Sequence, residues 1–427
     1  MTAHAVPRSA AESTLISQFE AQTDFAQSPA RAAAFRRFAE RGLPTRRVES
    51  WHYTDLRAAM LDAAPLAPAP DAAALEAAER ALAGCKRLGG ARLVLINGRF
   101  VEALSDSPPA GVTLGKVDHK TPVANDPMIA LAEAMSQGDC AVRVSDGAWI
   151  DEPIEIVRLV SGEGASSLYS RTEIAVGAGA RVSFLETFAG AGSAVQRHAL
   201  TSLALAADAS VKHAVVVEDR AELHLESQVA EIATGAELSA FGLVSGGSLV
   251  RRQLFVRLLG ERAKIALGGL ALLDHSRRSD TTLEVVHSAM GGTSREFYRS
   301  IVDDEAAGTF QGKVIVAAGA QKTDGAMKTQ AVLLSPQAQM NAKPELEIFA
   351  DDVVCGHGAT VGSLDPEQVF YLRARGVPRD EAEAMLLEAF GAEAIERMED
   401  DALAEALRAP FRAWLASRRA GPAEASP

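Results

Sequence analysis

The sequence predicts a mainly β fold in which a β-solenoid core lies between α-helical segments at both ends. Three observations support this prediction. A strand-like pattern runs almost without interruption from Val142 to Val354. Within that region, a small residue precedes a strand at nearly constant intervals. Helical periodicity, in contrast, dominates before residue 90 and after residue 363.

The repeated unit consists of an alanine, a polar residue and an aliphatic residue that begins a strand. It occurs at Ala180-Arg181-Val182, Ala209-Ser210-Val211, Ala236-Glu237-Leu238 and Ala263-Lys264-Ile265, with successive spacings of 29, 27 and 27 residues. Each interval has room for two strands and two turns, but not for a strand and a covering helix. Stacked units of this kind form a β-solenoid, with the small residues at its corners. A large antiparallel sandwich, with hairpins of similar length, is the alternative.

The N-terminal segment is expected to be helical and to end in a Pro/Ala linker over residues 64–70. Asp71 is a suitable N-cap for a short helix that ends at Gly84. The run Leu93 to Ile96 followed by Asn97-Gly98 predicts a strand and a tight hairpin. A further helix is expected over 126–135. Apolar residues at helical spacing between Ala11 and Arg41 are Leu15, Phe19, Phe25, Ala32, Phe35 and Phe38.

The C-terminal segment predicts three helices. Asp365 and Pro366 begin the first and Gly376 ends it, while Pro378 begins the second. The second helix carries Met385, Leu386, Ala389 and Phe390 on one face, and the third, expected to kink at Pro410, carries Leu403, Leu407, Phe411, Trp414 and Leu415. The expected domains are 1–90 (helical, with the linker), 91–362 (β-helix core), 363–419 (helical) and a disordered tail at 420–427.

Composition excludes several classes of protein. The 427 residues carry a formal net charge of −13, which argues against a nucleic-acid binder. Three scattered cysteines and the lack of a CxxC pair exclude a disulfide framework and a self-contained zinc or cluster site. The N-terminus lacks the apolar core of a signal peptide, and no apolar run is long enough to span a membrane. We therefore expect a cytoplasmic protein.

No nucleotide-binding glycine motif and no hydrolase or zinc-protease signature occurs in the chain, which weighs against a self-sufficient enzyme. The strongest candidate site is Cys355-Gly356-His357-Gly358. A thiolate and an imidazole two residues apart on a strand point the same way and can take two positions on a borderline metal. A tetrahedral metal needs about four ligands, so the others must come from elsewhere, most plausibly another chain. The alternative is that both residues are structural.

Other candidates carry weaker signals. His275 and His287 belong to a polar stretch that could line a surface site or form a solvated loop, and Gln321 to Asp324 could be a polar site or a turn. Cys85 lies beside Lys86 and Arg87, which could lower its pKa, whereas Cys140 precedes a strand and is expected in the core.

The segment from Lys343 to Thr360, with Pro-Glu-Leu-Glu-Ile followed by Asp-Asp-Val-x-Cys-x-His-Gly-Ala-Thr, resembles the SufB/SufD family of the SUF iron–sulfur cluster assembly system. The resemblance continues at Glu49 to Thr54 and through several later motifs. These are His287-Ser288, Phe310 to Val314, Gln321 to Asp324, Leu333 to Ser335, Gly362 to Asp365, Gln368 to Gly376 and Glu388 to Phe390. Within the family the chain is more similar to the SufD branch, because an N-terminal cysteine motif and a core cysteine typical of SufB are lacking.

This resemblance implies a right-handed parallel β-helix, a non-catalytic scaffold role and two partners. A SufB-like subunit would pair with the last coils to share a transient iron–sulfur cluster, with His357 and, less securely, Cys355 as donors. A SufC-like ATPase would dock on the C-terminal helices, and the isolated chain could form a homodimer. The expected ATPase contacts are Phe370, Tyr371, Leu372, Arg373, Met385, Leu386 and Phe390. A β-helix carbohydrate lyase and a metal-free interaction scaffold are the competing interpretations.

Overall fold

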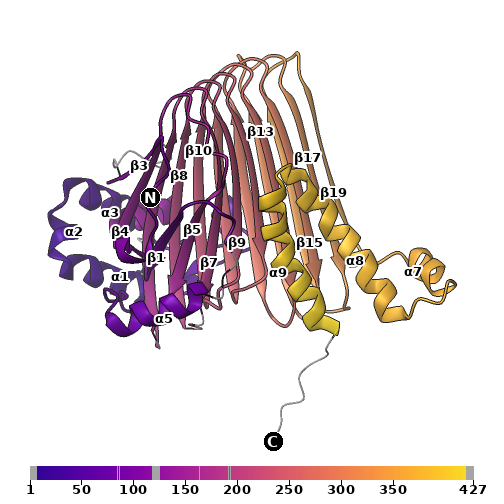
Figure 1. Cartoon of the computed structure of the whole chain (residues 1–427), viewed down its shortest axis with the longest axis horizontal. Coiled ribbons are helices and arrows are strands. Elements are labelled where there is room, and N and C mark those ends of the chain that lie inside the picture. The colour runs from indigo at the N-terminus through magenta and orange to yellow at the C-terminus, as the bar shows by residue number, and fades with distance from the viewer. Residues whose placement is uncertain are drawn as a thin grey trace, which may run out of the picture.

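The computed structural model describes residues 7–419, except for 84, 86, 118–125, 163, 191 and 193. The chain winds into a stack of coils, and each coil contributes one strand to each of two sheets (Figure 1). Successive coils pair in parallel, as β11 (Glu237–Val244) does with β9 (Ser210–Val217) and β13 (Lys264–Leu273). The predicted β-solenoid is confirmed. Because neighbouring coils pair in parallel, the antiparallel sandwich is ruled out.

The strands alternate between the two sheets along the chain. Antiparallel pairing is confined, in the described part of the chain, to β1–β2 and β3–β4 at the N-terminal end of the stack. The other strands of the 10-stranded sheet are β1 (Arg92–Ile96), β2 (Arg99–Phe100), β5 (Ile154–Val160), β7 (Arg181–Gly190), β15 (Thr293–Val302), β17 (Asp324–Leu333) and β19 (Val354–Gly362). The 9-stranded sheet comprises β3 (Val112–Gly115), β4 (Gly138–Val144), β6 (Ser166–Val176), β8 (Val195–Leu205), β10 (Leu223–Ile232), β12 (Leu249–Leu258), β14 (Arg278–His287), β16 (Ala307–Val316) and β18 (Gln339–Ile348).

The predicted small residues occupy the corners of the coils. Ala180, Ala209, Ala236 and Ala263 are all fully buried, and each directly precedes a strand of the 10-stranded sheet. The turns before these alanines contain residues with positive φ, such as Gly235 at +67°. A Cβ at Gly235 would lie 2.2 Å from Oδ1 of Asp208 on the preceding coil. The corners are therefore crowded because each turn stacks directly on the next.

The helices before residue 60 and the helix over 127–135 pack against the outer face of the 9-stranded sheet, whereas the helix Ala72–Ala83 packs against β1 and β5 of the 10-stranded sheet. Leu15 and Phe38 belong to the same buried cluster as Leu223 and Leu225 of β10. The predicted Asp71 N-cap accepts a hydrogen bond from the backbone of Ala74, and Asn97-Gly98 forms the predicted hairpin turn between β1 and β2. The N-terminal helices are α1 (Ala10–Ala21), α2 (Thr23–Gln27), α3 (Pro29–Arg41), η1 (Glu49–Trp51), α4 (Leu56–Ala59), α5 (Ala72–Ala83), η2 (Glu102–Leu104) and α6 (Pro127–Met135).

Residues 49–54, which we call the strap, cross the outer face of the last coils. The Ser50 carbonyl accepts hydrogen bonds from Arg251 of β12 and Gln311 of β16. The Thr54 hydroxyl donates to Asp280 of β14, which Arg251 also contacts. Glu49 forms an ion pair with Lys343 of β18 at 3.1 Å. The strap therefore connects the N-terminal region to four consecutive strands of one sheet.

The C-terminal helices are α7 (Pro366–Arg373), α8 (Arg379–Ile395), η3 (Glu396–Met398) and α9 (Asp401–Arg419), and α9 continues through Pro410. The helices α8 and α9 pack on the outer face of the 10-stranded sheet, whereas α7 buries no residue and projects beyond β19 (Figure 1). Asp365 caps α7 as predicted. The face of α8 that was expected to be apolar is not its buried face, because Leu387, Gly391 and Ile395 pack inward while Met385 is exposed. The predicted tail at 420–427, like Gly84 and Lys86, lies outside the described residues.

The crowded corners predict that Ala236→Leu lowers the free energy of unfolding by about 1–3 kcal/mol, because the larger side chain has no space between stacked turns. Urea denaturation followed by circular dichroism would measure the change. Glu237→Ala, on the exposed side of the same turn, is the control and should have little effect. Equal stability of Ala236→Leu and the unsubstituted chain would contradict the corner assignment.

Candidate functional site

Cys355 and His357 lie on β19, the last strand of the solenoid. Their side chains share one face of the strand, and Cys355 packs against the interior core. In the neighbouring strand β17, Gly325 pairs with Cys355 and the buried Met327 pairs with His357. Cys355 is half-buried and His357 is exposed. The two predicted donors therefore stand together at the open end of the stack and face its interior.

The glycines beside His357 leave open space around it. A Cβ on Gly356 or Gly358 would meet no other atom within 4 Å. Glycine weakens a strand, because it has no side chain to pack and loses more conformational freedom on folding. Packing within this chain does not require either glycine. The backbone around His357 is therefore accessible to another molecule.

The Cys355 thiol is not activated by its surroundings. Burial raises its pKa, and Asp324 and Glu296 add to that effect against an opposing backbone hydrogen bond from Gly325. A metal ion would reverse this, since a coordinated thiol loses its proton. Among the described residues, no three His, Cys, Asp or Glu side chains come together to hold a metal. The pair thus offers two donors and no complete site.

Both sheets end at this face of the stack in long strands with a free edge. Among the described strands, β18 pairs with β16 alone and β19 pairs with β17 alone. The edges carry exposed apolar side chains, namely Ile348, Phe349, Val354 and Val361. An exposed strand edge with apolar side chains is a template for pairing with another chain.

A groove of about 640 Å³ separates α7 and α8 from the end of β17. Phe370 and Arg373 line it, and Phe370 is 72% exposed. Of the other residues predicted to bind a partner, Tyr371 and Met385 are exposed, and Leu372, Leu386 and Phe390 are half-buried. The exposed predicted residues on α7 and α8 are therefore Phe370, Tyr371 and Met385, together with the charged Arg373.

Phe390 also has a structural role that the sequence did not reveal. The guanidinium of Arg299 lies 4.3 Å from the centre of the Phe390 ring and donates to its backbone carbonyl. Arg299 also pairs with Glu393 at 2.5 Å. Phe390 therefore helps to fasten α8 to β15.

The two histidines of the weaker candidate site differ in their exposure to solvent. His275 is an exposed turn residue with φ of +56°, as expected of a solvated loop, but His287 is fully buried in β14. Burial lowers the pKa of His287 to about 4, so the idea that the two histidines share a surface stretch is wrong. Gln321 to Asp324 form a turn that leads into β17.

The two remaining cysteines offer no activated thiol. Burial raises the pKa of Cys85 despite the nearby Arg92, which contradicts the expected lowering. Cys140 lies within β4 rather than before it, in the core as predicted, and burial raises its pKa to about 11.

Sequence analysis missed a set of charged residues inside the solenoid. Arg158 pairs with Glu186, whose other oxygen lies 3.2 Å from Nε2 of His213. Gln228 contacts Nδ1 of the same histidine at 2.8 Å. Burial alone would raise the pKa of Glu186, but Arg158 and His213 outweigh it and lower that pKa to about 2. The sequence did contain a signal for this set. In each strand, a charged residue stands at a position where alternation predicts an inward-facing apolar side chain.

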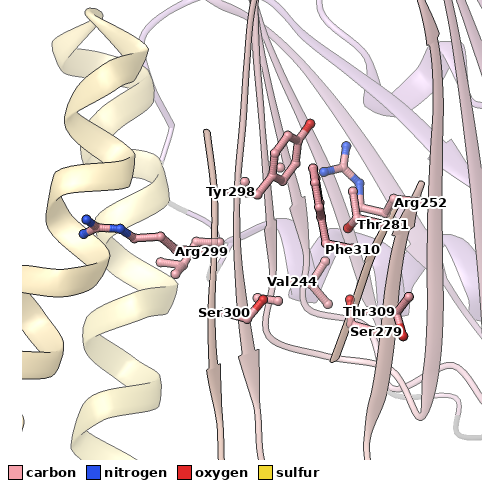
Figure 2. Close-up of a pocket in the computed structure, with 13 residues that line it drawn as sticks. Val244, Arg252, Ser279, Thr281, Tyr298, Arg299, Ser300, Thr309 and Phe310 are labelled. Atoms are coloured by element: carbon pink, nitrogen blue, oxygen red, sulfur yellow. The ribbon is translucent and has the colours of Figure 1, made fainter. Parts of the chain in front are cut away.

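A second interior group surrounds Arg252, which pairs with Glu226 at 2.7 Å. Figure 2 shows Arg252, Tyr298 and Phe310 gathered between the sheets, whereas Arg299 points toward the C-terminal helices. A cavity of about 20 Å³, enough for roughly one water molecule, remains beside them. A Cβ on Gly242 would overlap Arg252, so glycine provides the space for the guanidinium.

The sequence is similar to known proteins along most of its length. Residues 158–390 match the family model described as the SUF system FeS cluster assembly, SufBD core domain, and residues 15–156 match the SufBD protein N-terminal region. The chain is 30% identical to the iron–sulfur cluster assembly protein SufD of Escherichia coli over 389 residues, which cover 88% of this chain and 90% of that protein.

Two further relatives match over shorter stretches. Protein ABCI7, chloroplastic, of Arabidopsis thaliana is 28% identical over 267 residues, covering 60% of this chain and 56% of that protein. An iron–sulfur cluster assembly SufBD family protein of Synechocystis sp. is 35% identical over 153 residues, covering 36% and 34%. None of the helices in the described residues is both long and apolar enough to cross a bilayer.

The raised pKa values predict slow thiol chemistry. At pH 7 iodoacetamide should label Cys355 more slowly than an ordinary exposed thiol, because a smaller fraction is thiolate, and the rate should rise as pH passes 9. Cys140 should react last in the folded chain. Peptide mass spectrometry over time measures all three cysteines in one sample. Rapid labelling of Cys355 at pH 7 would mean that its thiolate is stabilised.

Proposed function

Because the chain belongs to the SufBD family of the SUF system for iron–sulfur cluster assembly, and resembles its SufD members, we propose that it is a scaffold subunit. A cluster is assembled where its open end meets a second, SufB-like chain. The main support is the joint position of Cys355 and His357, which face the interior beside two unpaired strand edges. The family membership argues against the alternative of a carbohydrate lyase.

Two donors from this chain suit a shared and transient cluster. A thiolate and an imidazole bind borderline and soft metals, but a tetrahedral metal needs about four ligands. The remaining ligands come from the partner chain. The cluster is therefore bound transiently and is released when the interface opens. The open space around Gly356 and Gly358 lets the partner backbone approach His357.

The partner docks by extending both sheets. Backbone N–H and C=O groups along β18 and β19 supply hydrogen bonds to added strands, and Phe349 and Val354 supply apolar contact. The same edges accept a second copy of this chain when the partner is missing, which gives a homodimer. In the heterodimer, by contrast, the SufB-like chain carries the metal ligands that this chain lacks.

A SufC-like ATPase docks on the exposed surface of α7 and α8. Exposed aromatic residues such as Phe370 and Tyr371 are typical anchors of protein interfaces, and the adjacent groove offers a pocket. ATP-driven pairing of two such ATPases, one on each scaffold subunit, pulls on the junction and exposes Cys355 and His357. The ATPase performs the hydrolysis, and this subunit acts in the cytoplasm, where thiols stay reduced.

The histidine can be tested in the assembled complex. His357→Ala should leave the fold intact, because the side chain is exposed, but should lower the iron content and the visible cluster absorption of the complex. The measurement is co-expression with SufB-like and SufC-like chains, anaerobic purification, and metal analysis. His275→Ala, at another exposed histidine, is the control. Normal cluster yield with His357→Ala would support the metal-free scaffold instead.

The docking surface can be tested separately. Phe370→Asp should weaken binding of the SufC-like ATPase by at least tenfold, because it replaces an exposed aromatic side chain with a charge. Phe370 is the better choice than Phe390, whose ring also fastens α8 to the sheet. Leu61→Asp, another exposed apolar residue outside this surface, should bind normally. Retention of full ATPase affinity by Phe370→Asp would place the docking site elsewhere.

A further inference from the structure

In the described part of the chain, Glu296 is a buried carboxyl group with no cationic partner. It lies on β15, on the inward-facing side that it shares with Ser294 and Tyr298. Only 2% of its surface is exposed, and among the described residues no arginine, lysine or histidine forms an ion pair with it. The nearest polar side chain is the buried hydroxyl of Ser294, which favours the ionised carboxylate only weakly. Burial of a carboxyl group without a cationic partner is costly.

The other buried acidic residues in the described part of the chain all have a cation nearby. Each lies within 4 Å of an arginine, so its charge is neutralised in the fold. These pairs are Glu12–Arg57, Glu133–Arg37, Glu155–Arg92, Glu186–Arg158, Asp219–Arg197, Glu226–Arg252 and Asp280–Arg251. Glu296 is therefore the exception to a rule that this chain otherwise follows.

The unpaired carboxyl group lies next to the open end of the solenoid. Ser294 pairs with Gly325, which pairs with Cys355, and Glu296 pairs with Met327, which pairs with His357. A Cβ on Gly325 would lie 3.4 Å from both the Ser294 Oγ and the Cys355 Sγ, so this glycine leaves a gap between the two side chains. Glu296 is close enough to raise the pKa of the Cys355 thiol.

No fixed positive charge faces Glu296 from the elements around it. Its neighbours on β13 and β17 are Leu267 and Met327. The strand across the interior contributes Gly312 and Val314, and deeper in the stack Arg252 is already paired with Glu226. Arg295 and Asp324 form an ion pair with each other on the exposed side. Among the described residues, the other titratable groups on the inward-facing side near Glu296 are Tyr298, Cys355 and His357.

We propose that Glu296 is the buried counter-charge for a divalent transition-metal cation held at Cys355 and His357. This inference rests on the proposed role of those two residues as metal donors. Two strand spacings, about 10 Å, separate Glu296 from them, and the interior between is apolar, so its charge is weakly screened. A cation at the open end supplies the positive charge that each other buried carboxylate receives from arginine.

The protonation of Glu296 agrees with this role. Burial raises its pKa to about 7, although Ser294 and Arg295 oppose the shift. Without a cation the group is therefore largely protonated below pH 7, and an adjacent cation favours its ionised form. Because the folded pKa is above the unfolded one, Glu296 makes the fold less stable as pH rises from about 4.5 to 7, and the loss persists above pH 7.

Glu296→Gln tests the proposal in the full-length chain, because it removes the charge and keeps the shape. Anaerobic titration with Co²⁺, followed by its thiolate absorption, should show affinity reduced about tenfold or more at pH 7.5. Asp324→Asn is the matched control, since this half-exposed carboxylate also influences Cys355, and it should change affinity less than threefold. Urea denaturation should show Glu296→Gln to be more stable than the unsubstituted chain above pH 7 and equally stable below pH 4.5.

Two outcomes would overturn the proposal. One is unchanged Co²⁺ affinity in Glu296→Gln, above all if the variant is destabilised at every pH, which would mark a structural residue. The other is that the double variant Cys355→Ala/His357→Ala binds Co²⁺ as the unsubstituted chain does. These measurements use the single chain and no cluster assembly, so they succeed or fail independently of cluster yield in the complex.

Discussion

The parallel hydrogen-bond ladder between coils is the constraint on which the rest of this structure depends. Each coil satisfies the backbone groups of the next, so the stack needs a different solution at each end. At the N-terminal end the sheets finish in the short antiparallel strands β2 and β3. At the other end β18 and β19 are long and uncovered along their edges. The candidate donors therefore lie at the end of the stack where the described strand edges are long and free.

The interior imposes a second constraint, which concerns charge. Two sheets that face each other leave a narrow space, and much of it is filled by aliphatic side chains. Charged groups enter this space as oppositely charged pairs, such as Arg158 with Glu186. Buried pairs of this kind are weak evidence for stability, because desolvation offsets their attraction, but removal of one partner is costly. Glu296 is in the situation that this cost describes, because it is a buried acidic residue without an arginine partner among the described residues.

Patterns that depend on local geometry were predictable from the sequence. The corner alanines, the Asn97-Gly98 hairpin and the Asp365 cap each follow from backbone preferences of a few residues. Features that depend on contacts between distant coils were not predictable. His287 looked like part of a polar loop, but its burial depends on packing within the stack. The buried face of α8 was misjudged for a similar reason, since the sheet beneath selects which of two apolar faces is covered.

The candidate donors could be located from sequence spacing, but their environment could not, because it depends on which strands remain unpaired. The contacts of the strap constrain the order in which the chain can fold during synthesis. Glu49 and Lys343 are 294 positions apart, so the contact must wait until almost the whole core has been synthesised and folded. A ribosome would release the first helices long before β18 exists. A product terminated before β18 would therefore leave Glu49 without Lys343, although Ser50 and Thr54 could still bind β12 and β14. The strap thus closes in stages, and only its first residue depends on the completed final coil.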